Sequence, residues 1–367
     1  MTKLLYLLNA RIPTPRAYGL QVMKMCEAFA AAGAEVELVV PTRRADEANE
    51  PFGYYAVQKN FKLTKLAVPD FLHYGPLGFF MSALIFSEKA RWLKSFWKAD
   101  IVYSRDALVL VQYLLLGRPL IFEAHAKPSF ISRIVARRAK RVVVISQGLK
   151  NAYHAVGVLE ERMIVAPDAV DEHLFDNVPS REEARAILGF PPEVRIALYA
   201  GHLYARKGAD TAAAAAFETP GVLFVFVGGT EEDVLAFKSR WGTNKDISIV
   251  GQVAHEKVPL YLRAADVLIL PNSGKDEDSA HFTSPMKLFE YMASGTPIVA
   301  SEVPSIREIL SEASAFLVAP DDLHALAEGI TETLAHPESA QARATHARQD
   351  SARYTWSNRA RSILFQK

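Results

Sequence analysis

The chain has 367 residues, of which 50% are hydrophobic, and a formal net charge of +1 at neutral pH. This length allows two domains with sizeable cores, and the balanced charge gives no electrostatic support for nucleic-acid binding. Residues 1–178 carry 23 Lys and Arg against 17 Asp and Glu, a net of +6, whereas the rest carries 19 against 24, a net of −5. The first half is therefore the better side for an anionic partner or membrane surface.

The N-terminus and the cysteine content favour a cytoplasmic protein. One Lys precedes the first apolar strand, which is not a signal-peptide pattern. No apolar run reaches the ~18–20 residues that would span a bilayer. Cys26, the only cysteine, lies in an apolar helical stretch and is expected to pack in the core. We expect a cytoplasmic protein that is at most peripheral to the inner face of the membrane.

Short apolar runs of strand length alternate with helical patterns along the chain. Runs that are apolar on both faces indicate buried parallel strands, and the helices between them indicate βαβ units. The strands predicted in the first half are Leu4–Leu8, Val36–Val40, Ile101–Tyr103, Leu120–Phe122 and Val142–Ile145. Those predicted in the second half are Arg195–Ala200, Val222–Val227, Ile247–Val250, Val267–Leu270, Ile298–Ala300 and Ala315–Val318.

The strand pattern restarts after Val178-Pro179-Ser180, which has the composition of a linker. We therefore predict an α/β protein with two doubly wound domains, residues 1–178 and 179–350, followed by a C-terminal helix over 351–367. Such sheets bind ligands at the carboxyl ends of their strands, so the residues of the site should directly follow strands.

The first candidate segment follows the strand Leu4–Leu8. The loop Asn9–Gly19 leads into a helix, and Gly19 stands where a backbone can approach a phosphate closely. The loop lacks the G-x-G-x-x-G pattern, so a nicotinamide cofactor is not indicated.

Polar side chains follow three further strands of the first half. Glu123 and His125 end one strand, and either can reach the site, although a lone His is often structural. Ser146 is expected to cap a helix. Asp168 and Asp171 follow a strand before the linker, where they either serve the site or cap turns.

In the second half, the loop Gly201–Gly208 directly follows a strand. Arg206 and Lys207 stand at the start of the next helix, where their charges add to the free amides. This arrangement suits a diphosphate and would neutralise a departing nucleoside diphosphate. A surface basic pair beside a glycine turn is the alternative.

The segment Ser284–Pro297 reads as a short helix with both ends marked. Ser284 is expected to be the N-cap, Pro285 suits the first turn, and Gly295 can end the helix in a left-handed conformation. Its free amides would suit an anion, and Glu290 could accept hydrogen bonds from ribose hydroxyls. The alternative is an amphipathic helix whose Lys287 and Glu290 form a solvated pair.

These segments, in this order, resemble the family-4 retaining nucleotide-sugar glycosyltransferases with the GT-B fold, which include sucrose-phosphate and bacterial envelope enzymes. The resemblance covers essentially the whole chain. It rests on the Gly19 loop, the Glu123–His125 strand end, Val143–Ser146, Pro167–Asp171, Gly201–Gly208 and Ser284–Pro297.

The resemblance implies two Rossmann-like domains facing a central cleft, with a C-terminal helix that crosses back to the N-terminal domain. The N-terminal domain would bind the acceptor and the C-terminal domain the nucleotide sugar. The reaction would retain anomeric configuration, with no cofactor and no metal, because basic residues neutralise the diphosphate.

The resemblance also implies roles for individual residues. Arg206 and Lys207 would bind the donor diphosphate and help it leave. Glu290 would bind the ribose hydroxyls, and His125 would lie near the donor sugar and its anomeric carbon. The backbone would approach phosphate or sugar at Gly19, Ser284, Pro285, Met286 and Lys287.

One position departs from the family pattern. A glutamate that contacts the donor sugar often stands eight positions before the ribose-binding one, where this chain has Phe282. Either the nearby run Asp276-Glu277-Asp278 supplies a carboxylate, or backbone amides around Thr283–Ser284 hold the sugar. A catalytically silent copy is also compatible with Phe282.

Aromatic and basic residues interleave in Phe71–Met81 and Arg91–Lys98 of the first half. Such a pattern is typical of an interfacial membrane contact, and the alternative is a core helix with solvated Lys and Arg. A second basic cluster comprises Arg133, Arg137, Arg138, Lys140 and Arg141. We therefore expect a glycan or lipid-linked acceptor and a peripheral contact with anionic membrane.

The sequence thus predicts a glycosyltransferase of envelope or polysaccharide synthesis. The alternatives are a silent GT-B partner protein and a GT-B sugar-nucleotide epimerase. The sequence does not identify the donor base (UDP and GDP are both candidates), the sugar, the acceptor or the oligomeric state.

Overall fold

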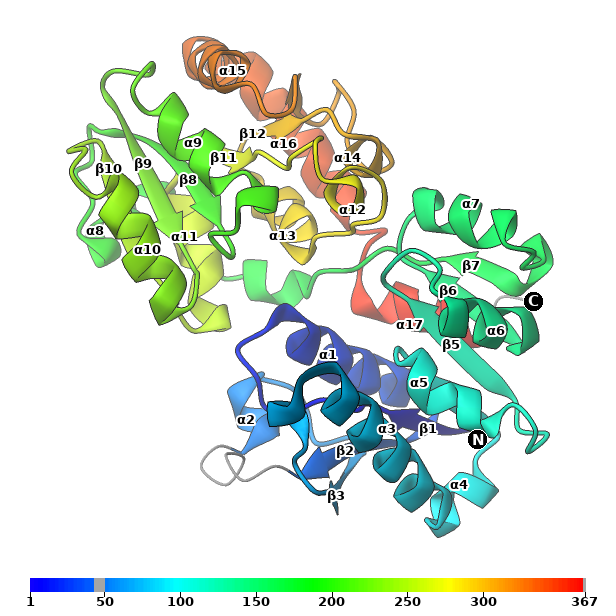
Figure 1. The fold of residues 1–367 in the computed structure, drawn as a ribbon. Helices are drawn as coiled ribbons and strands as arrows, with labels where there is room; N and C mark the ends of the chain where they lie inside the picture. Colours follow the sequence, from blue (N-terminus) through cyan, green and yellow to red (C-terminus); the bar gives the residue numbers. More distant parts are fainter. Residues whose placement is uncertain (43–49, 366–367) are drawn as a thin grey trace. The chain divides into compact units, whose positions relative to one another are not determined.

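The computed structural model describes residues 1–42 and 50–365 and divides into two compact units (Figure 1). The first unit comprises Met1–Pro167 together with the segment that starts at Trp356, and the second comprises Asp168–Thr355. Each unit has its own parallel sheet, so the prediction of two doubly wound domains is confirmed.

The sheet of the first unit has the strand order β3-β2-β1-β4-β5-β6-β7, and all of its neighbouring strands are parallel. The order reverses direction at β1, which is the doubly wound pattern. The strands are β1 (Lys3–Leu7), β2 (Glu35–Thr42), β3 (Lys62–Ala67), β4 (Ile101–Ser104), β5 (Leu120–Ala124), β6 (Arg141–Val144) and β7 (Met163–Val165).

Helices cover both faces of this sheet. Figure 1 shows α1 and α17 side by side, whereas α3 packs on α5 and α5 on α6. The helices are α1 (Ala17–Ala31), α2 (Pro51–Tyr54), α3 (Gly75–Arg91), α4 (Lys94–Lys98), α5 (Ala107–Leu110), α6 (Phe130–Arg138), α7 (Gln147–Ala155) and α17 (Trp356–Phe365), with short 3₁₀ turns η1 (Leu72–Tyr74), η2 (Val111–Tyr113) and η3 (Glu160–Arg162).

The sheet of the second unit is also entirely parallel, with the order β10-β9-β8-β11-β12-β13. Its direction reverses at β8, which places a ligand crevice at the carboxyl ends of β8 and β11. The strands are β8 (Arg195–Ala200), β9 (Val222–Val227), β10 (Ile247–Gly251), β11 (Val267–Leu270), β12 (Ile298–Ser301) and β13 (Phe316–Val318).

Alternate residues of β8 face two separate cores. Leu198 packs in one core with Leu288 of α13, whereas Ala197 packs in the other with Leu326 of α15. The helices are α8 (Arg181–Leu188), α9 (Ala209–Ala215), α10 (Glu231–Trp241), α11 (Val258–Ala264), α12 (Glu277–His281), α13 (Met286–Ser294), α14 (Pro304–Arg307), α15 (Leu323–Ala335) and α16 (Pro337–Ser351), with 3₁₀ turns η4 (Glu172–Phe175), η5 (Ala205–Lys207) and η6 (His255–Lys257).

The units divide before the linker that the sequence suggests at Val178–Ser180. Val170 and Phe175 already belong to a core of the second unit, and the N–H of Val170 donates to the carbonyl of Tyr354. The residues from Asp168 onward therefore fold with the second unit, and the division falls after Pro167.

The C-terminal helix crosses back to the first unit, as predicted, but it begins later than Ser351. Ser351 is the last residue of α16, and a turn separates it from α17 at Trp356. Helix α17 packs on α1. The last two residues of the predicted helix lie outside the described part of the chain. Among the described residues, no helix combines the length and apolar composition that crossing a membrane requires.

Candidate functional site

The loop after β8 presents two basic residues at the carboxyl edge of the second sheet. Arg206 and Lys207 form the short turn η5 and precede α9, separated from it by Gly208. Gly208 has a φ of +75°, and a Cβ there would lie 1.6 Å from the carbonyl oxygen of Pro271. This close approach requires glycine. It holds the basic turn against the chain that follows β11.

Lys207 and Lys287 are two partly buried lysines in this region, and the Nζ atom of Lys287 is itself buried. Burial lowers the pKa of Lys207 to about 8, and the charge of Arg206 adds to the effect. Burial also holds the pKa of Lys287 well below its usual value, with a further contribution from Lys207. Buried cations that repel one another are costly unless an anion joins them.

Lys287 is near one carboxylate, that of Glu290, whose charge only partly offsets the lowering of its pKa. Its Nζ lies 3.8 Å from the centre of the Tyr199 ring and has no hydrogen-bond partner among the described residues. Gly201 lies next to this side chain, and its φ of +134° is a backbone conformation that favours glycine. Lys207 Nζ has a hydroxyl partner, Thr283 Oγ1, at 3.4 Å. The two lysines are therefore arranged to receive an anionic ligand.

The N-terminus of α13 lies beside these lysines, but the prediction of Ser284 as its N-cap is wrong. Pro285 is the N-cap, no side chain caps the helix, and Met286 is the first helical residue. Ser284 Oγ instead accepts a hydrogen bond of 2.8 Å from the N–H of Asp168, 116 positions earlier. The first-turn amides of Met286 and Lys287 consequently have no capping side chain.

The rest of α13 agrees with the sequence. Gly295 ends the helix with a φ of +68°, and Leu288, Tyr291 and Met292 are buried. The Tyr291 hydroxyl accepts a hydrogen bond of 2.7 Å from the N–H of Ala200, the last residue of β8. This bond fixes α13 to the strand that carries the basic loop.

The predicted alternative of a solvated Lys287–Glu290 pair does not form. Glu290 Oε1 lies 2.7 Å from Nε2 of His255, which begins η6, while Lys287 turns to Tyr199. The Glu290 side chain is only 14% exposed, so its carboxylate is held by the histidine rather than by water. The role of His255 could not be predicted, because no local sequence pattern around it indicates a partner 35 positions later.

The run Asp276-Glu277-Asp278 forms the start of α12. Asp276 Oδ1 accepts a hydrogen bond from the N–H of Ser279, and Glu277 and Asp278 are exposed in the first turn. Phe282 ends this helix, partly buried. These three acidic residues thus form the N-cap and first turn of α12. Thr283, just after this helix, contacts Lys207.

In the first unit, Glu123 is the centre of a buried polar network. Its carboxylate accepts hydrogen bonds from Gln21 Nε2 at 2.8 Å, Tyr103 OH at 2.5 Å and Arg359 Nη2 at 2.7 Å. Although burial opposes ionisation, Arg359 and His125 hold the pKa of Glu123 well below its usual value. Arg359 lies on α17, so this carboxylate fixes the C-terminal helix to the first sheet.

His125 is positioned by the same carboxylate. Its Nε2 lies 2.8 Å from Glu123 Oε1, and its side chain is 19% exposed. The ring is therefore held by one nitrogen and partly reaches the surface of the first unit. This arrangement suits an oriented imidazole.

Other predicted positions have local structural reasons. Gly19 lies in the first turn of α1, where a Cβ would be 2.2 Å from the Tyr55 hydroxyl. Ser146 caps α7 and Asp171 caps η4, as expected. Cys26 is buried in the core, as predicted. No cluster of three or more potential metal ligands (His, Cys, Asp or Glu) occurs in residues 1–42 and 50–365.

The two doubly wound units and the basic carboxyl edge of the second define a two-domain α/β protein of the GT-B class. Two family models match the chain. Glycosyltransferase Family 4 matches residues 19–174, and Glycosyl transferases group 1 matches residues 180–350. The chain belongs to the family-4 glycosyltransferases with the GT-B fold.

Solved structures share the fold. Sucrose-phosphate synthase from Thermosynechococcus elongatus is similar with a TM-score of 0.81 and 21% identity, over 99% of this chain and 97% of that one. HepE of Anabaena, solved in complex with UDP, is similar with a TM-score of 0.77 and 17% identity, over 99% and 98%.

Curated relatives are similar over shorter stretches. The putative teichuronic acid biosynthesis glycosyltransferase TuaC of Bacillus subtilis is 29% identical over 42% of this chain. The D-inositol 3-phosphate glycosyltransferase of Mycolicibacterium smegmatis is 24% identical over 76% of it. The matches span 37% and 64% of the length of these relatives.

Proposed function

We propose that this protein transfers a sugar from a nucleoside-diphosphate sugar to a glycan or lipid-linked acceptor in cell-envelope or polysaccharide synthesis. The observation that carries the proposal is the pair of partly buried lysines with lowered pKa values, Lys207 and Lys287, beside the uncapped N-terminus of α13. Two ammonium groups and free amides at one sheet edge match the charge of a diphosphate.

The nucleoside would lie along α13. Glu290 is one turn further into the helix than Met286, and its carboxylate can accept hydrogen bonds from two vicinal hydroxyls. Its present partner, His255, would keep it oriented for the ribose. HepE and its complexes with UDP and UDP-glucose are consistent with a uridine diphosphate donor, which is the first to test.

The basic residues would also assist the chemistry. The bond between the anomeric carbon and the diphosphate oxygen breaks with both electrons remaining on the oxygen, the acceptor oxygen forms the new bond to the anomeric carbon, and its proton passes to the departing diphosphate. Arg206, Lys207 and Lys287 would stabilise the charge that grows on the leaving diphosphate. Because these three cations can neutralise it, we propose that no metal ion is needed and that the anomeric configuration is retained, as the family resemblance implies.

The acceptor would bind the first unit, with His125 as the candidate residue near the reacting carbon. Helix α3 of this unit carries an exposed apolar stripe, Leu77, Phe80, Met81 and Leu84, at the spacing of one helix face. Trp92 and Trp97 beside Lys94 and Lys98 add exposed aromatic and basic groups near α4. We propose that this face rests on an anionic membrane that presents a lipid-linked acceptor.

The test is donor turnover with a chelator present. The protein is incubated with UDP- and GDP-sugars, EDTA and candidate acceptors, and release of the nucleoside diphosphate is followed together with the product's anomeric coupling constant. We expect acceptor-dependent release and a product with the donor's configuration. Inversion would contradict retention, and binding without release from any donor would favour the silent protein that Phe282 first suggested. Conversion of the donor sugar without an acceptor would indicate an epimerase.

A further inference from the structure

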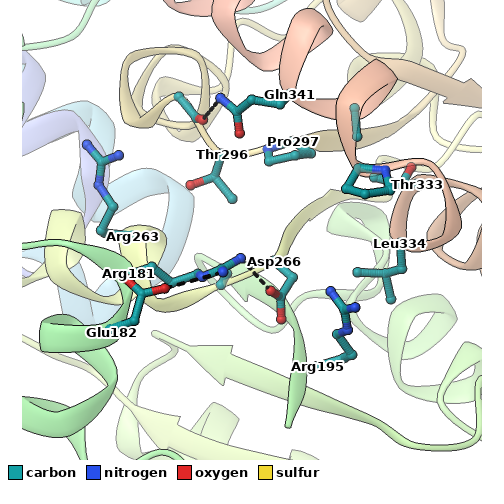
Figure 2. A pocket seen from close by; sticks show the side chains of 14 residues that line it. Arg181, Glu182, Arg195, Arg263, Asp266, Thr296, Pro297, Thr333, Leu334 and Gln341 are labelled. Atoms are coloured by element: carbon teal, nitrogen blue, oxygen red, sulfur yellow. Dashed lines mark hydrogen bonds and ion pairs between the residues drawn. The ribbon is translucent and has the colours of Figure 1, made fainter. Parts of the chain in front are cut away.

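A basic cavity lies in the second unit, at the end of its sheet opposite the candidate donor site. It has a volume of ≈ 310 Å³, the size of a small-molecule pocket. Figure 2 shows arginines from three elements around it: Arg181 at the start of α8, Arg195 at the start of β8 and Arg263 in α11. Asp266 and Pro297, which line the same cavity, each directly precede a strand. The cavity therefore lies at the amino ends of β8, β11 and β12, whereas Lys207 follows the carboxyl end of β8.

The acidic groups of the cavity are already occupied. Asp266 is bound by Arg181 Nη1 at 3.0 Å, by Arg185 Nη2 at 2.6 Å and by the N–H of Ile196 at 2.7 Å. Glu182, on the rim, pairs with Arg181 at 3.3 Å. The two carboxylates, Asp266 and Glu182, are thus already balanced by the two arginines Arg181 and Arg185. The charges of Arg195 and Arg263 are additional.

Arg263 and Arg195 remain without a carboxylate among the described residues. The Nε atom of Arg263 is buried and has no hydrogen-bond partner in that part of the chain. Burial lowers the pKa of Arg263, and the nearby positive charge of Arg348 adds to this effect. A guanidinium keeps its charge in proteins, so the cavity carries positive charge that no carboxylate of residues 1–42 and 50–365 pairs with.

Polar groups at the cavity wall suit a ligand larger than an ion. Gln341 of α16 lies on the wall, where its Nε2 makes only a 3.4 Å contact with the carbonyl of Gly295. Gln341 is exposed and its amide oxygen can accept from a hydroxyl. Planar guanidinium groups recognise phosphate by paired hydrogen bonds. The cavity combines these two chemistries in a space that holds more than inorganic phosphate.

We propose that this cavity is a second ligand site, which binds the phosphate group of a small phosphorylated molecule through Arg263 and Arg195. The site is separate from the candidate donor site, and the proposal does not depend on the donor assignment. The phosphate would pair with the guanidinium groups of Arg263 and Arg195, which both line the cavity. The ligand class is a phosphomonoester, and inorganic phosphate serves as a probe for its phosphate group alone.

The test uses inorganic phosphate and glucose 6-phosphate as probes. Because either can also enter a diphosphate site, titration calorimetry is done on the Lys207→Met protein, in which the donor site is impaired. We expect the Lys207→Met protein to bind the probes. Adding Arg263→Gln should weaken this binding at least about tenfold, because one charge-assisted hydrogen-bonded pair is lost. The matched control Arg353→Gln removes an exposed arginine of the same unit and should leave the affinity unchanged.

Arg195→Gln is the second variant, because Arg195 is exposed and its replacement leaves the fold intact. It should weaken binding in the same direction as Arg263→Gln. Equal affinity of the parent and both arginine variants, or no binding of either probe to the parent, would overturn the proposal. Tighter binding of glucose 6-phosphate than of phosphate would support a phosphomonoester over the free ion. Tighter binding of inorganic phosphate would contradict that ligand class.

Discussion

Nε2 of His255 lies 2.7 Å from Oε1 of Glu290, so the carboxylate expected to hold the ribose is itself held by η6, the turn before α11. A carboxylate with one oxygen fixed presents the other in a defined direction, which favours a bidentate contact with vicinal hydroxyls. The histidine is thus a positioning residue for a proposed donor-binding group.

Glu290→Gln should separate ribose recognition from phosphate recognition. We expect UDP affinity to fall about 10- to 100-fold, because a hydrogen bond to a charged group contributes about 1.5–3 kcal/mol. Inorganic pyrophosphate, which has no ribose, should bind both proteins equally in titration calorimetry. An equal loss for both ligands would show that the substitution damages the phosphate site instead.

His255→Ala should raise the donor KM several-fold while kcat changes less, because the histidine orients a binding group. His255→Asn, which keeps a hydrogen-bond donor, should recover part of the loss. Steady-state kinetics with a varied donor measure both. A fall in kcat with an unchanged KM would contradict a positioning role.

Lys287→Met should weaken diphosphate binding and increase the stability of the ligand-free protein. We expect the free energy of unfolding of the ligand-free protein to rise, because the substitution removes an ammonium group whose burial is unfavourable. Diphosphate affinity should fall at least about 30-fold, because removing a buried charge from its partner costs about 2–5 kcal/mol. Chemical denaturation and titration calorimetry test the two effects, and unchanged UDP binding would refute the lysine's role.

The pKa of Lys207, about 8, predicts a pH dependence of donor binding. Only the protonated lysine attracts the diphosphate, so affinity should be constant below pH 8 and fall above it by up to about tenfold per pH unit. Calorimetry in two buffers with different ionisation enthalpies should detect proton uptake near pH 8.5. The Lys207→Arg protein should show neither effect.

The lowered pKa of Lys207 also makes the stability of the fold depend on pH, and this stability should rise where donor affinity falls. The unfolded lysine keeps its proton up to its usual pKa of 10.5, whereas the folded one loses it near 8. Between these values the unfolded state binds more protons, so the contribution of Lys207 to stability rises with pH. Subtracting the pH profile of Lys207→Met from that of the wild type isolates this contribution, and a flat difference would refute the depressed pKa.

The apolar stripe of α3 should govern binding to vesicles. The double substitution Leu77→Ser and Phe80→Ser should reduce co-sedimentation with anionic vesicles at low salt by more than tenfold, since each buried apolar side chain contributes about 1.5–3 kcal/mol. Leu235→Ser, which replaces an equally exposed leucine of α10, should have no effect. Lack of binding by the wild type would remove the membrane contact from the proposal.

The interior of α13 could be predicted from the sequence because periodicity and Gly295 are local signals. Its N-cap could not, because Ser284 bonds to Asp168, which is distant in the chain. His255 was missed for the same reason. Strand β3 was missed because it is an edge strand whose partly exposed residues include Lys62 and Lys65, so the two-sided apolar signal is absent. Elements specified by their own residues were thus predictable, and contacts between distant segments were not.

The ion pair between Glu123 and Arg359 determines the order in which the two units can complete folding during synthesis. Arg359 is synthesised 236 residues after Glu123, which is about 10–50 s at ~5–20 residues per second. During that time the second unit, a continuous stretch of chain, can complete its own sheet. The first unit must wait with a buried carboxylate that lacks its arginine. The first unit, most of which is synthesised first, is therefore the unit that completes its folding last.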